Sequence, residues 1–444
     1  MTVSSSPLTP TDVHTPQVPW ECTDREALAT RPFGIYLHVP FCTSRCGYCD
    51  FNTYALHTFP AGPSGDPITY WVEQLCHELR LGAQLLAERG VTLPFASTVF
   101  FGGGTPSLLG DRLPAILEVV RECFGIAPGA EITSEANPES TSPELFDCWR
   151  KAGVNRLSLG MQSSSSRILA LLDRDHDPVR AVCAIREAKA AGFEHLNLDL
   201  IYGTPGETAD EVARSVDTVV ETGVDHVSAY ALTVEPGTAL FRKIKRGEIA
   251  PVDEDVQADR YYQIDAALQQ AGFAWYEVSN WARSQESRCR HNPGYWEGGN
   301  WWAAGPGAHG YLGGVRWSIR KNPRSYGALL SHGIYPADWC EVLTEKELRE
   351  ETIMLRLRVR DGLHRSVLTP AQTQVAATVV GDGLATWEGE YLVLTTRGRL
   401  LADGVIGDLL LVEEETPVNV AGTPYCVKLA LNARECQNWG RRHY

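Results

Sequence analysis

Short apolar runs alternate with longer amphipathic stretches through the first two thirds of the chain. The short runs are enriched in β-branched and aromatic residues and end near Gly, Pro, Asn or Asp, which is typical of β-strands. The predicted strands are Phe33–Val39, Ser97–Phe101, Glu131–Glu135, Asn155–Leu159, His195–Ile201, His226–Leu232 and Ala274–Val278.

The stretches between these strands carry apolar residues at the spacing of an amphipathic helix. In the first of them, Trp71, Leu75 and Leu79 share one helical face. Some stretches follow an N-capping residue such as Ser142 or end at a glycine such as Gly223. The predicted helices are Ile68–Arg89, Pro143–Lys151, Asp177–Ala191, Glu207–Thr222 and Asp255–Ala271.

The repeated order of strand and helix predicts a parallel sheet with helices outside it. About 250 residues are available for this pattern, which is the usual length of a (β/α) barrel. We therefore expect an α/β fold built on a full or partial TIM-like barrel. Chemistry in such barrels lies at the carboxyl ends of the strands, and the unusual motifs of this chain all follow predicted strands.

A different pattern begins near Asn280. Residues 280–326 are rich in Gly and Trp, which predicts loops. Beyond them, the sequence predicts helices at 344–358 and 368–380, a strand at 391–395 and a helix from 396 to 411. This order resembles a small winged-helix-like module, and residues 412–444 give no clear pattern.

We expect four parts along the chain. Residues 1–30, whose first twenty are rich in Ser, Thr and Pro, form a disordered N-terminal segment. Residues 31–280 form the barrel core and residues 281–340 an aromatic- and glycine-rich extension. Residues 341–444 form the winged-helix-like domain and a tail.

Composition narrows the class of protein. The 444 residues are 43% hydrophobic and 21% charged, as in ordinary globular proteins. The net charge of −15 repels phosphate backbones, so we do not expect a nucleic-acid partner. The N-terminus lacks the basic and apolar regions of a secretory signal. The twelve cysteines are therefore expected to stay reduced, as they do in the cytoplasm.

Three cysteines, Cys42, Cys46 and Cys49, lie within eight residues just after the first predicted strand. Three thiolates at this spacing can hold three irons of a [4Fe–4S] cluster and leave the fourth iron open, whereas ferredoxin clusters use four cysteines. An open iron favours chemistry over electron storage. The alternatives are three unrelated core cysteines or a zinc site, although zinc sites are usually closed by a fourth Cys or His.

Other motifs follow the later strands. The glycines at 102–104 can bring the backbone close to a ligand with free amide donors, although a tight turn explains them equally well. The polar residues that could face one cavity are Glu135, Gln162, Arg174 and Asp199. Carboxylates there could hold ribose hydroxyls or an ammonium group, and an arginine could pair with a carboxylate. Exposed or ion-paired surface residues are the alternative, least so for Asp199, which lies in an apolar strand.

His291 begins the segment His-Asn-Pro-Gly-Tyr-Trp within the aromatic-rich region. An imidazole beside aromatic rings can ligate a haem iron while the rings cover the macrocycle. A histidine in a loop, with tryptophans packed on the barrel, is the interpretation that the residues alone favour. His309 is a weaker second candidate.

The cysteine motif, followed by Asp50 and Phe51, resembles that of the radical S-adenosylmethionine (SAM) superfamily. More narrowly, the chain resembles the branch that holds HemW-like haem chaperones and HemN-like oxygen-independent coproporphyrinogen III oxidases. The matching stretches are Tyr36–Cys42, Gly102–Ser107, Glu135–Pro138, Asn155–Gly160, Asn197–Gly203, Tyr276–Asn280 and Gly305–His309.

By this resemblance, Cys42, Cys46 and Cys49 bind a [4Fe–4S] cluster, and SAM chelates its open iron. The family's chemistry is one-electron cleavage of SAM to a 5′-deoxyadenosyl radical, which the barrel shields. The positions that contact SAM in the family are here Tyr36, Tyr48, Gly103, Gly104, Thr105, Glu135, Gln162, Arg174 and Asp199. We assign no catalytic residue.

Two features separate the branches. The oxidases typically carry a fourth cysteine as Cys-x-Cys, whereas Asp50 and Phe51 follow Cys49 here. The chaperones carry His-Asn-x-x-Tyr-Trp, which is present at His291–Trp296. Both features favour the haem chaperone.

The resemblance thus implies a cytoplasmic protein that holds haem as cargo through His291 and passes it to haem-accepting proteins, including membrane or respiratory ones. An electron donor for the cluster and a second copy of the chain are further implied partners. The alternative is an enzyme that decarboxylates two propionates of coproporphyrinogen III to vinyl groups, giving protoporphyrinogen IX. A scaffold without catalysis is the third class.

Overall fold

The computed structural model describes residues 15–174 and 177–412 of the chain. The chain divides into two compact units, each with its own hydrophobic core. Unit 1 contains the described residues up to Trp275, together with Ser279–Gly294 and Gly299–Val342. Unit 2 contains Tyr276–Val278, Tyr295–Gly298 and the described residues from Leu343 onward.

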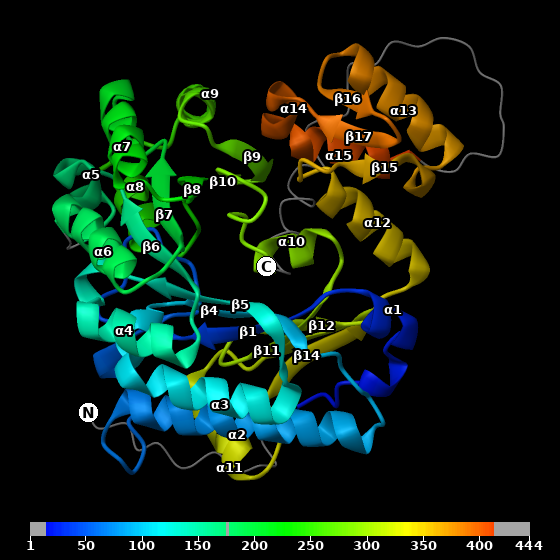
Figure 1. Ribbon diagram of the computed structural model, residues 1–444. Coiled ribbons are helices and arrows are strands. Elements are labelled where there is room, and N and C mark those ends of the chain that lie inside the picture. The colour runs from blue at the N-terminus through cyan, green and yellow to red at the C-terminus, as the bar shows by residue number, and fades with distance from the viewer. Residues whose placement is uncertain (1–14, 175–176, 413–444) are drawn as a thin grey trace. The chain divides into compact units, whose positions relative to one another are not determined.

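A 12-stranded sheet runs through unit 1, and parallel strands form its centre. In spatial order these strands are β1 (Phe33–Val39), β4 (Ala96–Gly103), β5 (Ile126–Ala136), β6 (Arg156–Gln162), β7 (His195–Tyr202) and β8 (His226–Ala231). Their order in space equals their order in sequence, so helical crossovers join neighbouring strands, as in a (β/α) barrel. Figure 1 shows helices along the outside of the sheet. The predicted α/β fold with a partial TIM-like barrel is confirmed.

The helices of unit 1 begin and end where local sequence favours it. At the start of α2, the Asp66 side chain accepts from two backbone amides, and Gly223 ends α7 with φ at 66°. The helices are α1 (Arg25–Thr30), α2 (Pro67–Glu88), α3 (Leu113–Phe124), α4 (Pro143–Ala152), α5 (Ser166–Leu171), α6 (Pro178–Ala190), α7 (Ala209–Thr222), α8 (Ala239–Lys245), α9 (Glu254–Gln270) and α11 (Pro323–Ser331). Helices α1, α3, α5 and α11 were not predicted from the sequence, and α3 has no capping side chain at Arg112. No helix in the described ranges is long and apolar enough to cross a lipid bilayer.

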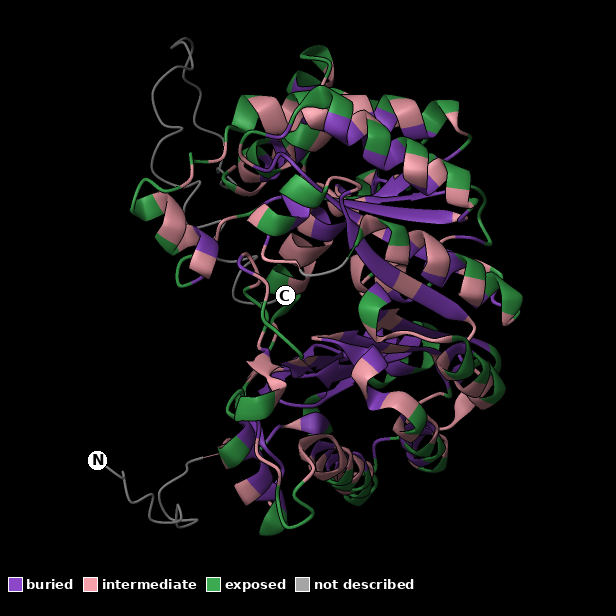
Figure 2. Cartoon of the chain, turned by 90° about the vertical axis from the view of Figure 1, so that its left-hand side faces the viewer, coloured by how far each residue is buried: buried purple, intermediate pink, exposed green. Residues whose placement is uncertain are grey.

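The main hydrophobic core lies between the sheet and its helices. On β1, the alternate residues Ile35, Leu37 and Val39 are fully buried in this core. Leu75 and Leu79 of α2 belong to the same cluster, as their helical spacing predicts. Figure 2 shows the strands mostly buried and the helices exposed along their outer sides. Because one face of each strand packs on the helices, the other face is left to line the barrel interior.

The region expected as loops contains regular structure. It holds β9 (Ala274–Glu277), β10 (Asn280–Ala282), α10 (His291–Trp296), β11 (Asn300–Ala304), β12 (His309–Leu312), β13 (Val315–Ile319) and β14 (Ala337–Val342). Strand β11 pairs parallel with β1, and β12, β13 and β14 continue the sheet as antiparallel strands. The expectation of loops over 280–326 is wrong because buried tryptophans such as Trp302 and Trp317 are strand residues, and the glycines form turns such as that at Gly313. The segment 281–340 therefore extends the barrel sheet.

Residues 15–30 differ from the expected disorder over residues 1–30. Trp20 is 1% exposed and packs against Trp302, Trp317 and Tyr335, with ring centroids 5.1–5.7 Å apart. Asp24 caps α1 through two backbone amides. The expectation is wrong here because a few apolar residues in a polar segment are enough to bury it. Residues 1–14 lie outside the described residues.

Unit 2 contains the helices predicted over 344–358 and 368–380 and the strand predicted over 391–395, together with two further short strands. Its elements are α12 (Glu345–Arg356), β15 (Leu363–His364), α13 (Pro370–Gly381), β16 (Ala385–Glu388), β17 (Tyr391–Leu394), α14 (Thr396–Leu400) and α15 (Ala402–Leu410). The three strands form an antiparallel sheet in the order β15-β17-β16. The predicted helix from Thr396 to Leu411 is divided at Leu401. Residues 413–444 lie outside the described residues.

We predict that Trp20→Ala lowers the free energy of unfolding by about 3–5 kcal/mol, because truncation of a fully buried tryptophan leaves a cavity. The measurement is urea unfolding followed by circular dichroism. Trp339→Ala is the matched control, since Trp339 is 37% exposed on β14 and should cost much less. Equal losses for the two variants would show that residues 15–24 add nothing to the core.

Candidate functional site

A cavity of about 610 Å³ opens at the carboxyl ends of the parallel strands in unit 1. Barrel interiors are usually filled by branched apolar side chains, but most of the side chains that line this wall are polar. The wall residues on β5 to β8 are Thr133, Glu135, Ala136, Arg156, Ser158, Gly160, Gln162, Asn197, Asp199, Ile201, His226, Ser228, Tyr230 and Ala231. A polar interior of this size can hold a small molecule.

The cysteine loop that follows β1 forms part of the cavity lining. At its base, β2 (Phe41–Cys42) pairs in parallel with β3 (Tyr54–Ala55). The Gly47 amide donates to the Leu172 carbonyl at 3.2 Å, and the Leu240 amide donates to the Gly47 carbonyl at 2.7 Å. The fold therefore holds the loop both at its base and at its middle.

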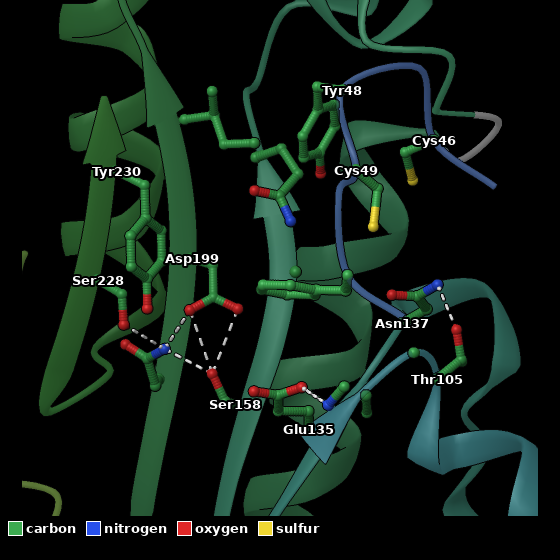
Figure 3. Close-up of a pocket in the computed structure, with 18 of the residues that line it drawn as sticks. Cys46, Tyr48, Cys49, Thr105, Glu135, Asn137, Ser158, Asp199, Ser228 and Tyr230 are labelled. Atoms are coloured by element: carbon green, nitrogen blue, oxygen red, sulfur yellow. Dashed lines mark hydrogen bonds between the residues drawn. The ribbon is translucent and has the colours of Figure 1, made fainter. Parts of the chain in front are cut away.

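All three thiols of the loop line the cavity. Figure 3 shows the Cys46 and Cys49 side chains pointing from the loop into it. Burial raises the pKa of Cys42 to about 11, against a hydrogen bond with Thr105 that lowers it, and the neighbouring thiols raise it further. With this pKa, the Cys42 thiol keeps its proton at neutral pH when no metal is bound. Because a metal ligand must be a thiolate, binding of a metal would displace that proton.

Within the described ranges, no three His, Cys, Asp or Glu side chains gather closely enough to hold one metal ion. In an iron–sulfur cluster each thiolate binds a separate iron, so the sulfurs need not converge on one point. Three thiols on one held loop fit such a cluster.

The glycine-rich turn after β4 packs against the protein itself. The Gly103 amide donates to Glu135 Oε2 at 3.1 Å, and the amides of Gly104 and Thr105 donate to backbone carbonyls at 2.7 and 2.9 Å. The expectation that these amides are free for a ligand is therefore wrong. Gly103 has φ at 107°, and a Cβ there would lie 2.5 Å from the His38 ring, so glycine is needed for the close approach of two chain segments.

Glu135 and Asp199 lie inside the barrel on the cavity wall. Burial raises the pKa of Glu135 to about 8, and the charge of Asp199 adds to this effect. Burial also raises the pKa of Asp199 to about 6, although hydrogen bonds from Asn197 and Ser158 oppose the rise. Asn197 Nδ2 lies 2.7 Å and Ser158 Oγ 3.2 Å from Asp199 Oδ1, and Figure 3 shows Ser158 and Asp199 facing each other. These are the partners that the sequence could not identify for Asp199.

Arg174 joins the cysteine loop to the end of β6. Its Nη1 donates to Cys46 Sγ at 3.3 Å, and its Nη2 donates to the Gly160 carbonyl at 3.1 Å. Its buried Nε has no hydrogen-bond partner among the residues that the structure describes. Gln162 follows a bulge in β6 and has φ at 66°, a strained conformation that often marks functional sites. The unsatisfied Nε of the positively charged Arg174, which lies beside the thiols, fits an anionic group of a ligand.

The two tyrosines predicted at the site lie in different environments. Tyr48 lines the cavity and packs against a small apolar cluster that includes Ile168 and Leu240. The Tyr36 hydroxyl lies 3.0 Å from His38 Nδ1, and Tyr36 is not among the cavity residues in the described part of the chain. The cavity lining therefore brings together eight of the nine predicted residues, all except Tyr36: Tyr48, Gly103, Gly104, Thr105, Glu135, Gln162, Arg174 and Asp199.

His291 is the first residue of α10 rather than a loop residue. Its ring is 4% exposed, stacks on Phe100 with centroids 5.1 Å apart, and places Nδ1 2.8 Å from Thr98 Oγ1. Burial lowers the pKa of His291 to about 3, so the imidazole is neutral. Asn292 lines the cavity, whereas the cavity lining in the described ranges does not include His291. The structure thus keeps His291 out of this lining, although its ring stacks on that of Tyr36 with centroids 6.5 Å apart.

A set of polar residues beside and below Asp199 was not predicted from the sequence. This set contains Thr133, Arg156, Ser158, Asn197, His226 and Ser228. The signal for them was present: along β5 to β8, polar residues recur at every second position, as in Arg156 and Ser158. A period of two in a strand predicts one shared face, and helices already cover the other.

Comparison with known proteins places these features in a family. Residues 36–219 match the model of the radical SAM superfamily. The chain is 53% identical to the haem chaperone HemW of Mycobacterium tuberculosis (strain H37Rv), over 89% of this chain and 99% of that protein. It is 33% identical to the HemW of Escherichia coli (strain K12), over 86% of this chain and 99% of that protein.

Among solved structures, the coproporphyrinogen III oxidase HemN of Escherichia coli, described as a radical SAM enzyme, superposes with a TM-score of 0.72. The match covers 86% of this chain and 92% of that one, at 23% sequence identity. At this identity the likeness shows a shared fold.

We predict that Glu135→Gln becomes more stable relative to the unchanged protein as the pH rises. The folded-state pKa of Glu135, about 8, lies above the unfolded value of 4.5, so the folded form binds more protons between these values. The free energy of unfolding of the unchanged protein then falls by up to about 1.4 kcal/mol per pH unit over this range. Glutamine does not ionise, so Glu135→Gln removes this loss. Urea unfolding at pH 5, 6.5 and 8 measures the difference, with Glu221→Gln on the surface of α7 as control. A difference that does not change with pH would contradict the prediction.

Proposed function

Because the chain belongs to the radical SAM superfamily and, within it, to the HemW family, we propose that it is a cytoplasmic haem chaperone. In this proposal it carries a [4Fe–4S] cluster and SAM, binds haem, and passes the haem to haem-accepting proteins. The observation that carries the proposal is the loop of Cys42, Cys46 and Cys49 on a polar barrel cavity. Phe51 stands two positions after Cys49, where the oxidases' Cys-x-Cys motif has its fourth cysteine.

We propose that the three thiolates hold the cluster and that SAM lies between the cysteine loop and β5 to β7. Bound together, these groups supply one-electron chemistry. Arg174 supports this arrangement, since its Nη1 donates to Cys46 Sγ and so ties that side chain to the end of β6. The barrel wall keeps water away from the reacting groups.

Glu135 and Asp199 would hold the ribose hydroxyls or the ammonium group of SAM. A carboxylate with a pKa raised to about 8 by burial ionises readily once a cation lies beside it. Asn197 and Ser158 hold the carboxylate of Asp199 in place. The Gly103 amide does the same for Glu135, so the amide contributes through the carboxylate rather than through direct contact with a ligand.

His291 remains the proposed haem ligand, on the strength of the His-Asn-x-x-Tyr-Trp motif. A neutral imidazole is the form that binds iron. Since the ring now stacks on Phe100 and lies beside Thr98, ligation requires α10 or the ring itself to move.

We predict that Cys46→Ala abolishes cluster assembly while the fold survives, because the apolar core of unit 1 does not include Cys46. The measurement is iron and sulfide content after anaerobic reconstitution, with circular dichroism for the fold. Cys148→Ala on α4 is the control and should assemble the cluster normally. A globally unfolded Cys46→Ala protein, or one with full iron content, would contradict this assignment.

We predict that the anaerobic, reconstituted protein binds haem and does not convert coproporphyrinogen III when SAM and a reductant are present. Absorbance titration measures haem binding, and chromatography of porphyrins measures conversion. His291→Ala should weaken haem binding at least about tenfold (about 1.4 kcal/mol) without loss of cluster absorbance.

His332→Ala is the matched control for the haem titration and should leave haem affinity unchanged, because His332 is exposed at the end of α11. Formation of protoporphyrinogen at turnover rates would replace the chaperone by the oxidase. Unchanged haem affinity in His291→Ala would remove that residue as the ligand.

A further inference from the structure

An arginine lies at the floor of the barrel cavity, below the residues assigned to SAM. Arg156 on β6 is 2% exposed. Its Nε donates to Glu131 Oε2 at 2.8 Å and its Nη2 to the Arg288 carbonyl at 3.0 Å. Its buried Nη1 has no hydrogen-bond partner in the described part of the chain, although the residue lines the cavity.

A second unsatisfied donor lies next to it. Thr133 pairs with Arg156 in the register of β5 and β6, is 1% exposed, and also lines the cavity. Its buried Oγ1 likewise lacks a partner within residues 15–174 and 177–412. Buried donors without acceptors are rare and costly in folded proteins, so two of them on one cavity wall indicate a ligand that supplies the acceptors.

Glu131 does not fill this role, because its carboxylate is already occupied. Its Oε2 accepts from Arg156, and its Oε1 accepts from the amides of Arg290 and His291 at 2.8 and 3.1 Å. The Nη1 edge of Arg156 therefore keeps its hydrogens for another acceptor. A guanidinium edge beside a hydroxyl is chemically matched to a carboxylate.

The floor lies one level below Glu135, since Thr133 and Glu135 are two residues apart on β5, and farther from the end of β6. Arg156 and Gly160 lie four residues apart on β6, which corresponds to roughly 13 Å at the usual rise of a strand. Ser158 and Asn197, which hydrogen-bond with Asp199, lie between the two levels. A ligand carboxylate that reaches Arg156 is therefore not the anionic group that would lie beside Arg174 and the cysteine loop.

We propose that Arg156 and Thr133 form a carboxylate subsite that takes one propionate of the porphyrin cargo. The inference rests on the proposed function for the identity of the cargo, since haem carries two propionates. It gives the chain a means to select porphyrins by their side chains, independently of the iron. Because Arg156 is paired with Glu131, the pair has no net charge. It would recognise a carboxylate through the fixed orientation of the Arg156 N–H groups.

Thr133→Val is the sharpest test, because it keeps the shape of the side chain and removes only the hydroxyl. Removal of Arg156 would instead leave Glu131 buried without its cation and could unfold the barrel. Thr133→Val should weaken the binding of haem about fivefold, the effect of one lost hydrogen bond. Haem dimethyl ester, whose carboxylates are blocked, should bind the unchanged protein more weakly than haem does. The ester should bind Thr133→Val with the same affinity as it binds the unchanged protein.

Thr133→Ser keeps the hydroxyl and should restore haem affinity. Arg156→Lys keeps the charge but loses the guanidinium edge, and should reduce the preference for haem over its ester. SAM affinity, measured by equilibrium dialysis, should be the same in the unchanged protein and Thr133→Val, which excludes the SAM carboxylate as the source of the effect.

The inference is overturned if the unchanged protein binds haem and its dimethyl ester equally well, or if Thr133→Val weakens both to the same extent. In those cases haem binding itself stands, and the two donors serve only the fold. If the unchanged protein binds neither porphyrin, the proposed function fails as well, so the two failures are distinguishable.

Discussion

The two-residue period of the parallel strands is the constraint on which this structure depends. On β1, Ile35, Leu37 and Val39 pack beneath the helices, so the intervening positions must face the barrel interior. On β5 to β8 the interior positions are mostly polar, and the stability of unit 1 therefore comes from the layer between sheet and helices. This division allows a reactive, hydrogen-bonded cavity to exist within a stable domain.

The polar interior holds together as a network. Asn197 Nδ2 lies 2.7–2.9 Å from oxygens of Ser158, Asp199 and Ser228, and its Oδ1 lies 2.8 Å from His226 Nδ1. A buried network of this kind fixes the position of each carboxylate but leaves its protonation sensitive to a ligand's charge. The raised pKa values of Glu135 and Asp199 follow from that environment, and they suit a site whose charge is completed by what it binds.

Family membership and local geometry contribute different kinds of support. The near-complete overlap with proteins named HemW establishes the family, whereas the likeness to the HemN structure establishes a shared barrel. The same barrel fold therefore occurs both in this family and in a protein named as an oxidase. What separates them must lie in particular residues rather than in the barrel, and Phe51, two positions after the third cysteine, is one such candidate.

Sequence alone determined strands β1 and β4 to β8 of the barrel, most of the large helices and the cysteine motif, because these depend on local periodicity and spacing. Strand β1 has the predicted bounds, and the helical face of Trp71, Leu75 and Leu79 is buried as expected. Tertiary structure alone decided how the Gly103 amide is used, where the His291 ring lies and which residues surround Asp199. It also turned the tryptophan-rich region into sheet and ordered the segment around Trp20. Each of these outcomes depends on contacts between residues far apart in the chain, which a local pattern of apolar and polar positions does not specify.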